Sequence, residues 1–217
     1  ATWPPWIWEW LTVLGDVRVA LALALLFSLR HPRLFWALIL AALMAFAVTQ
    51  GLKPWVAAGR PPAVLGVESF HLIGPVLRKS SFPSGHTVTA AVLLGGWICF
   101  LRSEPLRLLL VMLALMVGVS RVAVGVHWPV DVTAGLVGGW LFAWLGLSLS
   151  RRWEAAAGRL GFHLVCVLAA AAGALMLLQT DGGYAGARGL QLVIGCVTLS
   201  WGIGQYLVMA LGRILKV

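Results

Sequence analysis

The chain has 217 residues, of which 61% are hydrophobic and 11% are charged, whereas a soluble domain has roughly 45–50% apolar and about 25% charged residues. This composition excludes a disordered protein and a secreted disulfide scaffold, and it predicts one membrane-embedded domain over 1–217, because spans of about 20 residues use nearly the whole chain. The formal charge of +9 comes from 16 Lys and Arg against 7 Asp and Glu. These basic residues are scattered between apolar segments and form no stripe, so we expect no nucleic-acid partner.

Apolar runs between polar segments predict seven membrane-spanning helices, at about 11–29, 33–51, 86–101, 107–124, 130–150, 162–179 and 190–211. The first run carries Asp16 and Arg18 near one end, where charged side chains can extend toward the lipid headgroups. We therefore expect an all-α, polytopic transmembrane helix bundle of six to seven spans, with a loop or short helices on the extracytoplasmic side. Before the first run, four Trp between Trp3 and Trp10 predict an interfacial aromatic anchor.

The basic residues between spans predict the orientation of the chain. One side carries nine of them: Arg30, Arg33, Arg102, Arg107, Arg151, Arg152, Arg159, Arg213 and Lys216. The other side carries six: Lys53, Arg60, Arg78, Lys79, Arg121 and Arg188. Because cytoplasmic loops are enriched in Lys and Arg, we expect the first side to be cytoplasmic, the N-terminus to be outside and the C-terminus inside.

Smaller features of the sequence predict packing rather than chemistry. Cys99, Cys166 and Cys196 each lie inside an apolar run, so we expect buried, free thiols and not a metal site or a disulfide. The spacing of Gly135 and Gly139 predicts close helix packing within the chain. The N-terminus has no basic region typical of a cleavable signal peptide, so we expect the first span itself to direct insertion.

Three polar clusters interrupt the apolar chain, and the predicted topology places all three at the same membrane face. The first is Lys53 to Pro61 after the second span, the second is Ser81 to Thr87 at the start of the third span, and the third is Ser120 to Asp131 between the fourth and fifth spans. The longest stretch between spans, about 51–84, holds four basic residues, Glu68, His71 and five prolines. We expect the chemistry of this protein to lie here.

The residue types in these clusters favour binding of a phosphate. Lys53 offers a point charge, and Arg60 and Arg121 offer planar guanidinium groups that can hold phosphate oxygens and stabilise charge in a transition state. Ser84 and Gly85 precede an apolar run and are expected at a helix N-terminus, where free N–H groups and the helix dipole favour an anion. The sequence therefore predicts an anion pocket at the lipid surface.

Two histidines have distinct candidate roles at this pocket. His127 lies four residues before Asp131, and Pro129 is typical of a first helical turn. The Asp131 carboxylate can then fix one ring nitrogen of His127 and leave the other free to attack phosphorus. His86 can donate a proton to the leaving oxygen and afterwards activate water. We expect a two-step hydrolysis that needs neither a metal nor another cofactor.

The three clusters resemble a known family. Lys-x6-Arg-Pro at Lys53, Pro-Ser-Gly-His at Pro83 and Ser-Arg-x5-His-x3-Asp at Ser120 are similar to the three signature motifs of the type 2 phosphatidic acid phosphatase superfamily. The motifs cover about 53–131, and the pattern of spans resembles the integral-membrane bacterial lipid phosphatase branch over about 11–150. The two spans at about 162–211 lie beyond the six-helix plan of many members.

The resemblance implies a metal-independent lipid phosphatase with a motif core at about 50–135. It implies that His127 is the nucleophile, Asp131 its orienting carboxylate and His86 the general acid. It also implies that phosphate is bound by a set of five residues: Lys53, Arg60, Ser84, Gly85 and Arg121. Ser120 belongs to a motif, but its chemistry favours neither a phosphate contact nor a helix cap.

The implied enzyme removes a terminal phosphate from a membrane lipid at the periplasmic face of a bacterial inner membrane. Candidate substrates are undecaprenyl diphosphate, phosphatidylglycerol phosphate, phosphatidic acid and a lipid A phosphate, and the sequence does not choose among them or indicate an oligomeric state. A lipid phosphotransferase would use the same first half-reaction. A transporter or flippase is disfavoured because the middles of the spans contain almost no ionisable residues, and the apolar runs disfavour the soluble haloperoxidases that share the motifs.

Overall fold

The computed structural model describes residues 3–65, 69–152 and 160–214, and every regular element in this part of the chain is a helix. The α-helices are α1 (Pro5–Val13), α2 (Val17–Leu25), α3 (Pro32–Val56), α4 (Pro61–Val64), α5 (Gly85–Phe100), α6 (Glu104–Ala123), α7 (Pro129–Arg152), α9 (Leu160–Gln179) and α10 (Arg188–Ile214), and η1 (Ala185–Ala187) is a 3-10 turn. The prediction of an all-α transmembrane bundle is confirmed. Arg159 and Lys216, used above to predict the orientation, lie outside the described residues.

Five helical segments are long and apolar enough to cross a membrane: Pro32–Val64, Glu104–Ala123, Pro129–Arg152, Leu160–Gln179 and Ala185–Leu211. The predicted count of six to seven was therefore slightly too high. The predicted span at 86–101 is the 16-residue helix α5, which at 1.5 Å per residue is about 24 Å long. The predicted span at 11–29 contains only the end of α1 and all of α2, which are separate helices of nine residues each.

The break between α1 and α2 has a local cause. The Asp16 side chain accepts a hydrogen bond from the Arg18 backbone N–H at 2.8 Å, so Asp16 caps the start of α2. At Gly15 the chain passes so close to α5 that an added Cβ would lie 2.7 Å from the carbonyl oxygen of His86. Hydropathy detects neither the cap at Asp16 nor the close approach at Gly15. The apolar run therefore predicts a single span.

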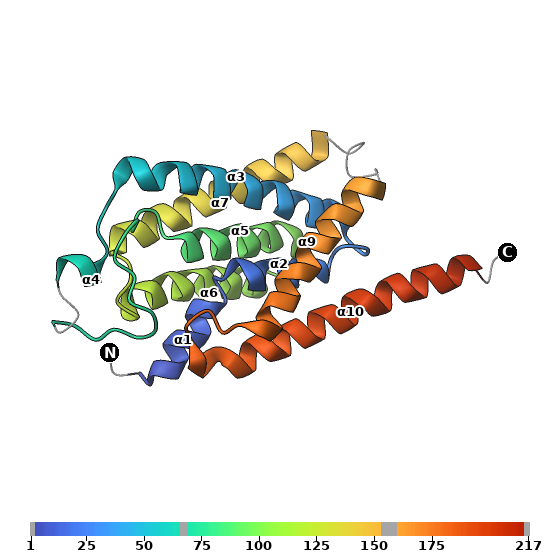
Figure 1. Ribbon diagram of the computed structural model, residues 1–217. Helices are drawn as coiled ribbons and strands as arrows, with labels where there is room; N and C mark the ends of the chain where they lie inside the picture. Colours follow the sequence, from blue (N-terminus) through green and yellow to red (C-terminus); the bar gives the residue numbers. More distant parts are fainter. Residues whose placement is uncertain (1–2, 66–68, 153–159, 215–217) are drawn as a thin grey trace.

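The helices form one bundle in which α5 is central (Figure 1). Helix α5 packs against α3, α6 and α7, while α9 packs on α2, and α10 runs along α9 and α2. Helix α4, the loop 69–84 and α1 gather at one end of the bundle, where α3 and α6 end and α5 and α7 begin. We call this the site end, and we call the opposite end, where α5 ends and α6 begins, the far end.

Small residues bring α5 and α7 into close contact. A Cβ added at Gly139 would lie 2.5 Å from the Cβ of Ala91 and 2.6 Å from the carbonyl oxygen of Val88. A Cβ added at Gly135 would lie 3.0 Å from the carbonyl oxygen of Ser84. The predicted packing role of this glycine pair within the chain is confirmed, and it fixes the start of α5 beside the start of α7.

The prediction of buried thiols is wrong for two of the three cysteines. Cys166 is buried, but Cys99 and Cys196 are exposed because they lie on the outward faces of their helices. The Trp-rich segment forms α1, which packs against α6 and η1. Within it Trp8 is buried in the core, so this helix is part of the bundle as well as a source of exposed aromatic rings.

Candidate active site

His127 and Asp131 meet at the start of α7. Pro129 is the first residue of the helix, and Asp131 lies in its first turn, so the carboxylate points back along the chain. The Oδ2 atom of Asp131 lies 3.2 Å from Nδ1 of His127. The same oxygen accepts hydrogen bonds from the backbone N–H of Trp128 at 2.8 Å and from the Ser81 hydroxyl. Both side chains of the pair are buried, with exposures of 2% and 1%.

The other nitrogen of the His127 ring faces Arg60. Nη1 of Arg60 lies 3.2 Å from Nε2 of His127. A guanidinium can only donate hydrogen bonds, so Nε2 is the acceptor in this contact and carries a lone pair. Nδ1 then carries the proton and donates to Asp131. These two contacts select the tautomer in which Nε2 is a potential nucleophile.

Arg60 is held by backbone carbonyl groups. Its Nε donates to Lys79 O at 2.8 Å, Nη1 also donates to Val126 O at 3.2 Å, and Nη2 donates to Ser80 O at 3.3 Å. These acceptors are neutral, and within the described part of the chain Arg60 forms no salt bridge, although the charge of Asp131 acts on it. The guanidinium is therefore both fixed in position and available to an anion.

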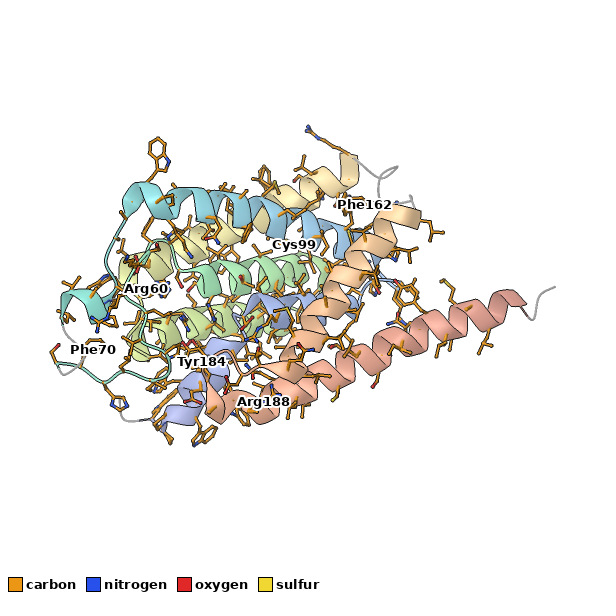
Figure 2. The ribbon with its side chains drawn as sticks, in the orientation of Figure 1. Arg60, Phe70, Cys99, Phe162, Tyr184 and Arg188 are labelled. Carbon is orange, nitrogen blue, oxygen red and sulfur yellow. The ribbon has the colours of Figure 1, made fainter. Side chains whose placement is uncertain are left out.

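The loop 69–84 closes over this group of residues. Ile73 N donates to Val124 O at 3.2 Å, and Gly125, at φ +79°, lies so close to the loop that a Cβ would meet the Phe70 ring at 2.5 Å. Only glycine combines this left-handed conformation with this contact. Figure 2 shows Arg60, Phe70 and Tyr184 at the site end, with Phe162 toward the far end.

Burial keeps His127 neutral. The residue lies between α6 and α7, outside the spanning helices. Desolvation by burial lowers the pKa of His127 from 6.5 to about 4, and the charges of Arg60 and Arg121 lower the pKa further, while the hydrogen bond to Asp131 raises it. At neutral pH the ring is therefore uncharged, as an attacking nitrogen must be.

Arg121 lies in the last turn of α6 and is only 1% exposed. Its Nη1 donates to Thr12 Oγ1 at 2.7 Å and to Tyr184 Oη at 2.8 Å, and its Nε has no hydrogen-bond partner within the described part of the chain. Its charge acts on Arg60, His127 and His86. Burial of a charged guanidinium with an unpaired N–H lowers the stability of the fold, and an anionic ligand that accepts this hydrogen bond would offset the loss.

The N-terminus of α5 lies beside this group. Ser84 is the residue before the helix, and its N–H donates to Asp131 O at 3.1 Å, which joins the second and third motifs. Gly85 is the first helical residue, and an added Cβ there would meet no atom within 4 Å. Open space therefore lies beside the free N–H groups of the first turn, where an anion is favoured.

A cavity of about 310 Å³ lies between α2, α3 and α5. Its polar end is lined by Asp16, Lys53, Gly85 and His86, and the rest of its wall is almost entirely apolar. Along α3 the lining residues run from Lys53 to Leu38, which at 1.5 Å per residue is about 22 Å. Half of the hydrocarbon core of a bilayer is about 15 Å thick, so this groove is long enough for an extended lipid chain.

The structure brings all eight predicted site residues to the site end, but in two groups. Hydrogen-bond contacts join Arg60, His127 and Asp131, and the charge of Arg121 acts on this group. Lys53, Gly85 and His86 line the cavity, and Ser84 bridges the two groups through Asp131. The charge of Arg60 also acts on Lys53 and His86, so the two groups are electrostatically coupled. Ser120 donates to Val117 O within its own helix at 2.6 Å, so it contacts the backbone of α6. Among the described residues, no three His, Cys, Asp or Glu side chains are grouped so as to hold a metal ion.

Sequence reasoning missed several residues of the site. Ser81 lies inside the second cluster, but no role was assigned to it, and Trp128, whose indole N–H donates to Gly59 O at 2.9 Å, was not singled out. Thr12 and Tyr184 lie far from the motifs and had no recognisable signal. The signal that could have pointed to them is Arg121 itself, because a cation in an apolar segment with no acidic residue nearby in the sequence needs polar partners from elsewhere in the chain.

Fold and site together define a polytopic helical membrane protein that carries a buried histidine–carboxylate pair flanked by two guanidinium groups. The family model described as PAP2 superfamily matches residues 18–155. Because this match covers more than half of the chain, the chain belongs to the PAP2 superfamily, and the resemblance found in the motifs is confirmed.

Individual relatives are similar over shorter stretches. An undecaprenyl-diphosphatase of Sulfolobus acidocaldarius is 38% identical over 35% of this chain and 36% of its own length. The undecaprenyl-diphosphatase BcrC of Bacillus subtilis is 31% identical over 52% of this chain and 66% of its own length. The chain thus spans between about a third and two thirds of these curated relatives. The crystal structure of Aquifex aeolicus LpxE is similar with a TM-score of 0.60 and 27% identity, over 65% of this chain and 84% of that one.

Proposed function

We propose that this protein is a membrane lipid phosphatase that hydrolyses a terminal phosphate of a lipid phosphate or diphosphate through a phosphohistidine intermediate. The observation that carries the proposal is the position of the His127 ring between Asp131 and Arg60. One nitrogen is fixed by the carboxylate, and the lone pair of the other faces a cation that would hold a phosphate oxygen. The names of the relatives, undecaprenyl-diphosphatases among them, support the substrate class.

In the first step, Nε2 of His127 attacks phosphorus, and the bond from phosphorus to the bridging oxygen of the substrate breaks. His86, in the wall beside the open space at the α5 N-terminus, acts in its protonated form, which the negative charge of the bound phosphate favours, and donates the proton that the leaving oxygen requires. Arg60, Arg121 and the N–H groups at the start of α5 stabilise the charge on the nonbridging oxygens. Lys53 at the polar end of the groove contributes a further positive charge.

In the second step, His86 takes a proton from water, and the water oxygen attacks the phosphorus bound to His127. The bond between phosphorus and Nε2 breaks, inorganic phosphate forms, and both histidines return to their starting states. Asp131 stays ionised and stabilises the ring while it carries positive charge. No step requires a metal ion.

The cavity between α2, α3 and α5 is the proposed place of the lipid chain. Its polar end touches His86 and Lys53, and its apolar length follows the helices into the membrane. A chain that follows the groove would leave the phosphate at the site end. With the predicted excess of basic residues on the opposite side, we propose that the site faces the periplasm of an inner membrane.

The test is phosphate release from a panel of lipid phosphates in detergent, with and without EDTA. We expect release that EDTA does not change, and we expect label from a radioactive terminal phosphate to remain on the protein after an alkaline quench, which preserves phosphohistidine. Loss of activity in EDTA would contradict the mechanism. Transfer of the label to an added lipid alcohol, with no free phosphate, would instead identify a phosphotransferase.

For the topology, a reporter fused to the C-terminus is expected to be cytoplasmic. An extracytoplasmic reporter would overturn the proposed orientation.

A further inference from the structure

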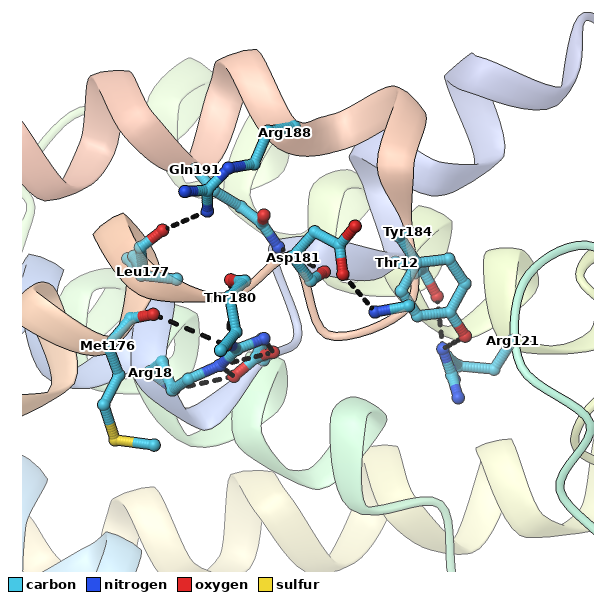
Figure 3. A network of polar contacts seen from close by, with 12 residues as sticks. Thr12, Arg18, Arg121, Met176, Leu177, Thr180, Asp181, Tyr184, Arg188 and Gln191 are labelled. Atoms are coloured by element: carbon cyan, nitrogen blue, oxygen red, sulfur yellow. Dashed lines mark hydrogen bonds and ion pairs between the residues drawn. The ribbon is translucent and has the colours of Figure 1, made fainter.

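Arg121 is held by two residues that lie outside the family match at 18–155. Thr12 lies on α1, and Tyr184 lies between α9 and α10, directly before η1. Their hydroxyl oxygens are 2.7 and 2.8 Å from the same atom, Nη1 of Arg121. The guanidinium carbon also lies 5.7 Å from the centre of the Tyr184 ring. The position of this buried cation is therefore set by elements from both ends of the chain (Figure 3).

The two hydroxyls use only one of the three nitrogens of the guanidinium group. Within the described residues Arg121 forms no salt bridge, and its Nε has no hydrogen-bond partner. A structural arginine at 1% exposure would be expected to have a carboxylate or a full set of acceptors. Neutral hydroxyls keep Nη1 in place without cancelling the charge, which leaves the group suited to a phosphate.

The segment that carries Tyr184 is itself held by polar contacts. Asp181 accepts from the backbone N–H of Gly183 at 2.9 Å through its side chain, and its carbonyl accepts from Gln191 Nε2 at 3.0 Å. Arg188 donates to the carbonyl groups of Leu177 and Leu178, each at 2.6 Å. These contacts join the end of α9 to the start of α10 and cap the carbonyl groups at the end of α9 (Figure 3).

The same segment is joined to the rest of the bundle on two sides. Arg18 of α2 forms a salt bridge with Asp16 at 2.6 Å and donates to both Thr180 oxygens. Trp10 of α1 donates to Gly186 O at 2.9 Å. Tyr184 is only 4% exposed. Its neighbours therefore fix the side chain in one position.

We propose that Thr12 and Tyr184 are positioning residues that hold Arg121 for the phosphate of the substrate, so that α1 and the α9–α10 hairpin are part of the active machinery. This inference rests on the proposed function, because it assigns Arg121 to the reacting phosphate. Neither residue touches the substrate. Each acts through Arg121, whose charge must lie in a defined place when negative charge develops on the phosphate oxygens.

The test uses Tyr184→Phe and Thr12→Val, which remove the hydroxyls and nearly preserve shape. We expect kcat to fall about tenfold in each, with a smaller change in KM, because the lost contact orients a group that acts mainly in the transition state. Tyr206→Phe is the matched control, since Tyr206 contacts His163 and Ser28 and not the site. This control should keep wild-type kcat.

A double-mutant cycle separates positioning from a merely structural role. In an Arg121→Lys background, Tyr184→Phe should lower kcat less than twofold further, because the guanidinium that it positions is gone. A full tenfold loss in that background, or a Tyr184→Phe enzyme as active as Tyr206→Phe, would overturn the inference. Thermal unfolding in the same detergent identifies a variant that has lost its fold. If Tyr184→Leu, which removes the ring as well as the hydroxyl, is folded, it should lose more kcat than Tyr184→Phe, and an equal or smaller loss would also contradict the inference.

Inorganic orthovanadate, a phosphate analogue, provides a second readout. Its inhibition constant should rise about tenfold in Tyr184→Phe and stay unchanged in Tyr206→Phe. If the wild type neither hydrolyses any lipid phosphate nor is bound by vanadate, the proposed function fails and the inference fails with it. If the wild type is active and only the predicted difference between the two tyrosines is missing, the inference alone fails.

Discussion

The two ends of the bundle are stabilised in different ways. At the site end, polar contacts join segments far apart in the sequence, such as Ser81 with Asp131 and Trp128 with Gly59. At the far end, ring contacts predominate, such as His31 on Phe100 with ring centres 4.6 Å apart, and hydrogen bonds join Tyr206 to His163 and Ser28. Polar contacts depend strongly on geometry, whereas ring packing tolerates change. The difference shows that the site end requires side chains in defined positions, whereas the far end requires only side chains that fill the interior.

The largest expected contrast comes from replacing one histidine at each end. His127→Ala should lower kcat by at least about 10⁴-fold, because it removes the attacking nitrogen. His163→Ala should stay within about twofold, since His163 packs against Phe35 and contacts Tyr206. Steady-state phosphate release measures both. Near-native activity in His127→Ala would remove the basis of the comparison.

Asp131→Asn should lower kcat by roughly 10³-fold while leaving the fold intact. The amide cannot stabilise a positively charged ring, and its N–H₂ group favours the wrong tautomer of His127. Ser81→Ala, which removes one partner of the same oxygen, should have a smaller effect. The ratio of the two losses measures how much of the effect comes from the carboxylate itself.

The proton affinity of His127 should be about 300-fold below that of an ordinary histidine. Its pKa of about 4, lowered from 6.5 chiefly by burial, corresponds to this factor. The ring therefore stays neutral as pH falls from 7 to 5. Its contribution to the free energy of unfolding is fully present above pH 6.5, decreases as pH falls below 6.5, and is lost once pH has fallen through about 4. Nitrogen NMR of labelled histidine, assigned with His127→Ala, measures the titration. Arg60→Gln should raise the pKa, since the charge of Arg60 lowers it; a wild-type midpoint near 6.5 would contradict the buried, neutral ring.

Narrowing the groove should lower activity on long-chain lipids by about tenfold. Ala42 lines the cavity on α3, so Ala42→Phe is expected to displace part of the chain and reduce kcat/KM for long substrates but not for short, water-soluble phosphates. Leu43→Phe is the matched control, because Leu43 is 59% exposed on the outer face of the same helix. Equal losses on long and short substrates would show that the cavity does not hold the chain.

The smallest effect on catalysis is expected from the aromatic packing at the far end. Trp36 packs edge-on against Phe162 at 4.5 Å, and Trp36→Leu should lower the free energy of unfolding by about 1–3 kcal/mol with kcat within twofold. Thermal unfolding in detergent and phosphate release measure the two quantities. A tenfold loss in kcat would mean that the far end is coupled to the site.

Much of the fold could be predicted because apolar runs and spans correspond closely. The predicted spans 107–124 and 130–150 match α6 and α7 to within three residues at each end. The contact between His127 and Asp131 could be anticipated from a spacing of four and a proline at the helix start. The helix break within the run at 11–29 could not be predicted, because the hydropathy of the run is continuous. The break depends on a cap at Asp16 and on the approach of Gly15 to α5.

Thr12 and Tyr184 mark the limit of sequence reasoning for the site. Each is an ordinary hydroxyl residue, 109 and 63 positions away from the arginine that it contacts. No local pattern connects residues at such separations, since only the packing of α1 against α6 and η1 brings them together. The motifs thus indicate which groups react, whereas the packing indicates what holds them.

The contact between Arg60 and Nε2 of His127 has a consequence for the release of product. In the proposed intermediate, Nε2 is bonded to phosphorus and can no longer accept this hydrogen bond, so the guanidinium is free to bind phosphoryl oxygens. Once water has removed the phosphoryl group, Nε2 regains its lone pair and competes with free phosphate for the same donor. The resting contact therefore acts as an internal competitor that weakens product inhibition, and it should let the enzyme turn over in the presence of its own inorganic phosphate.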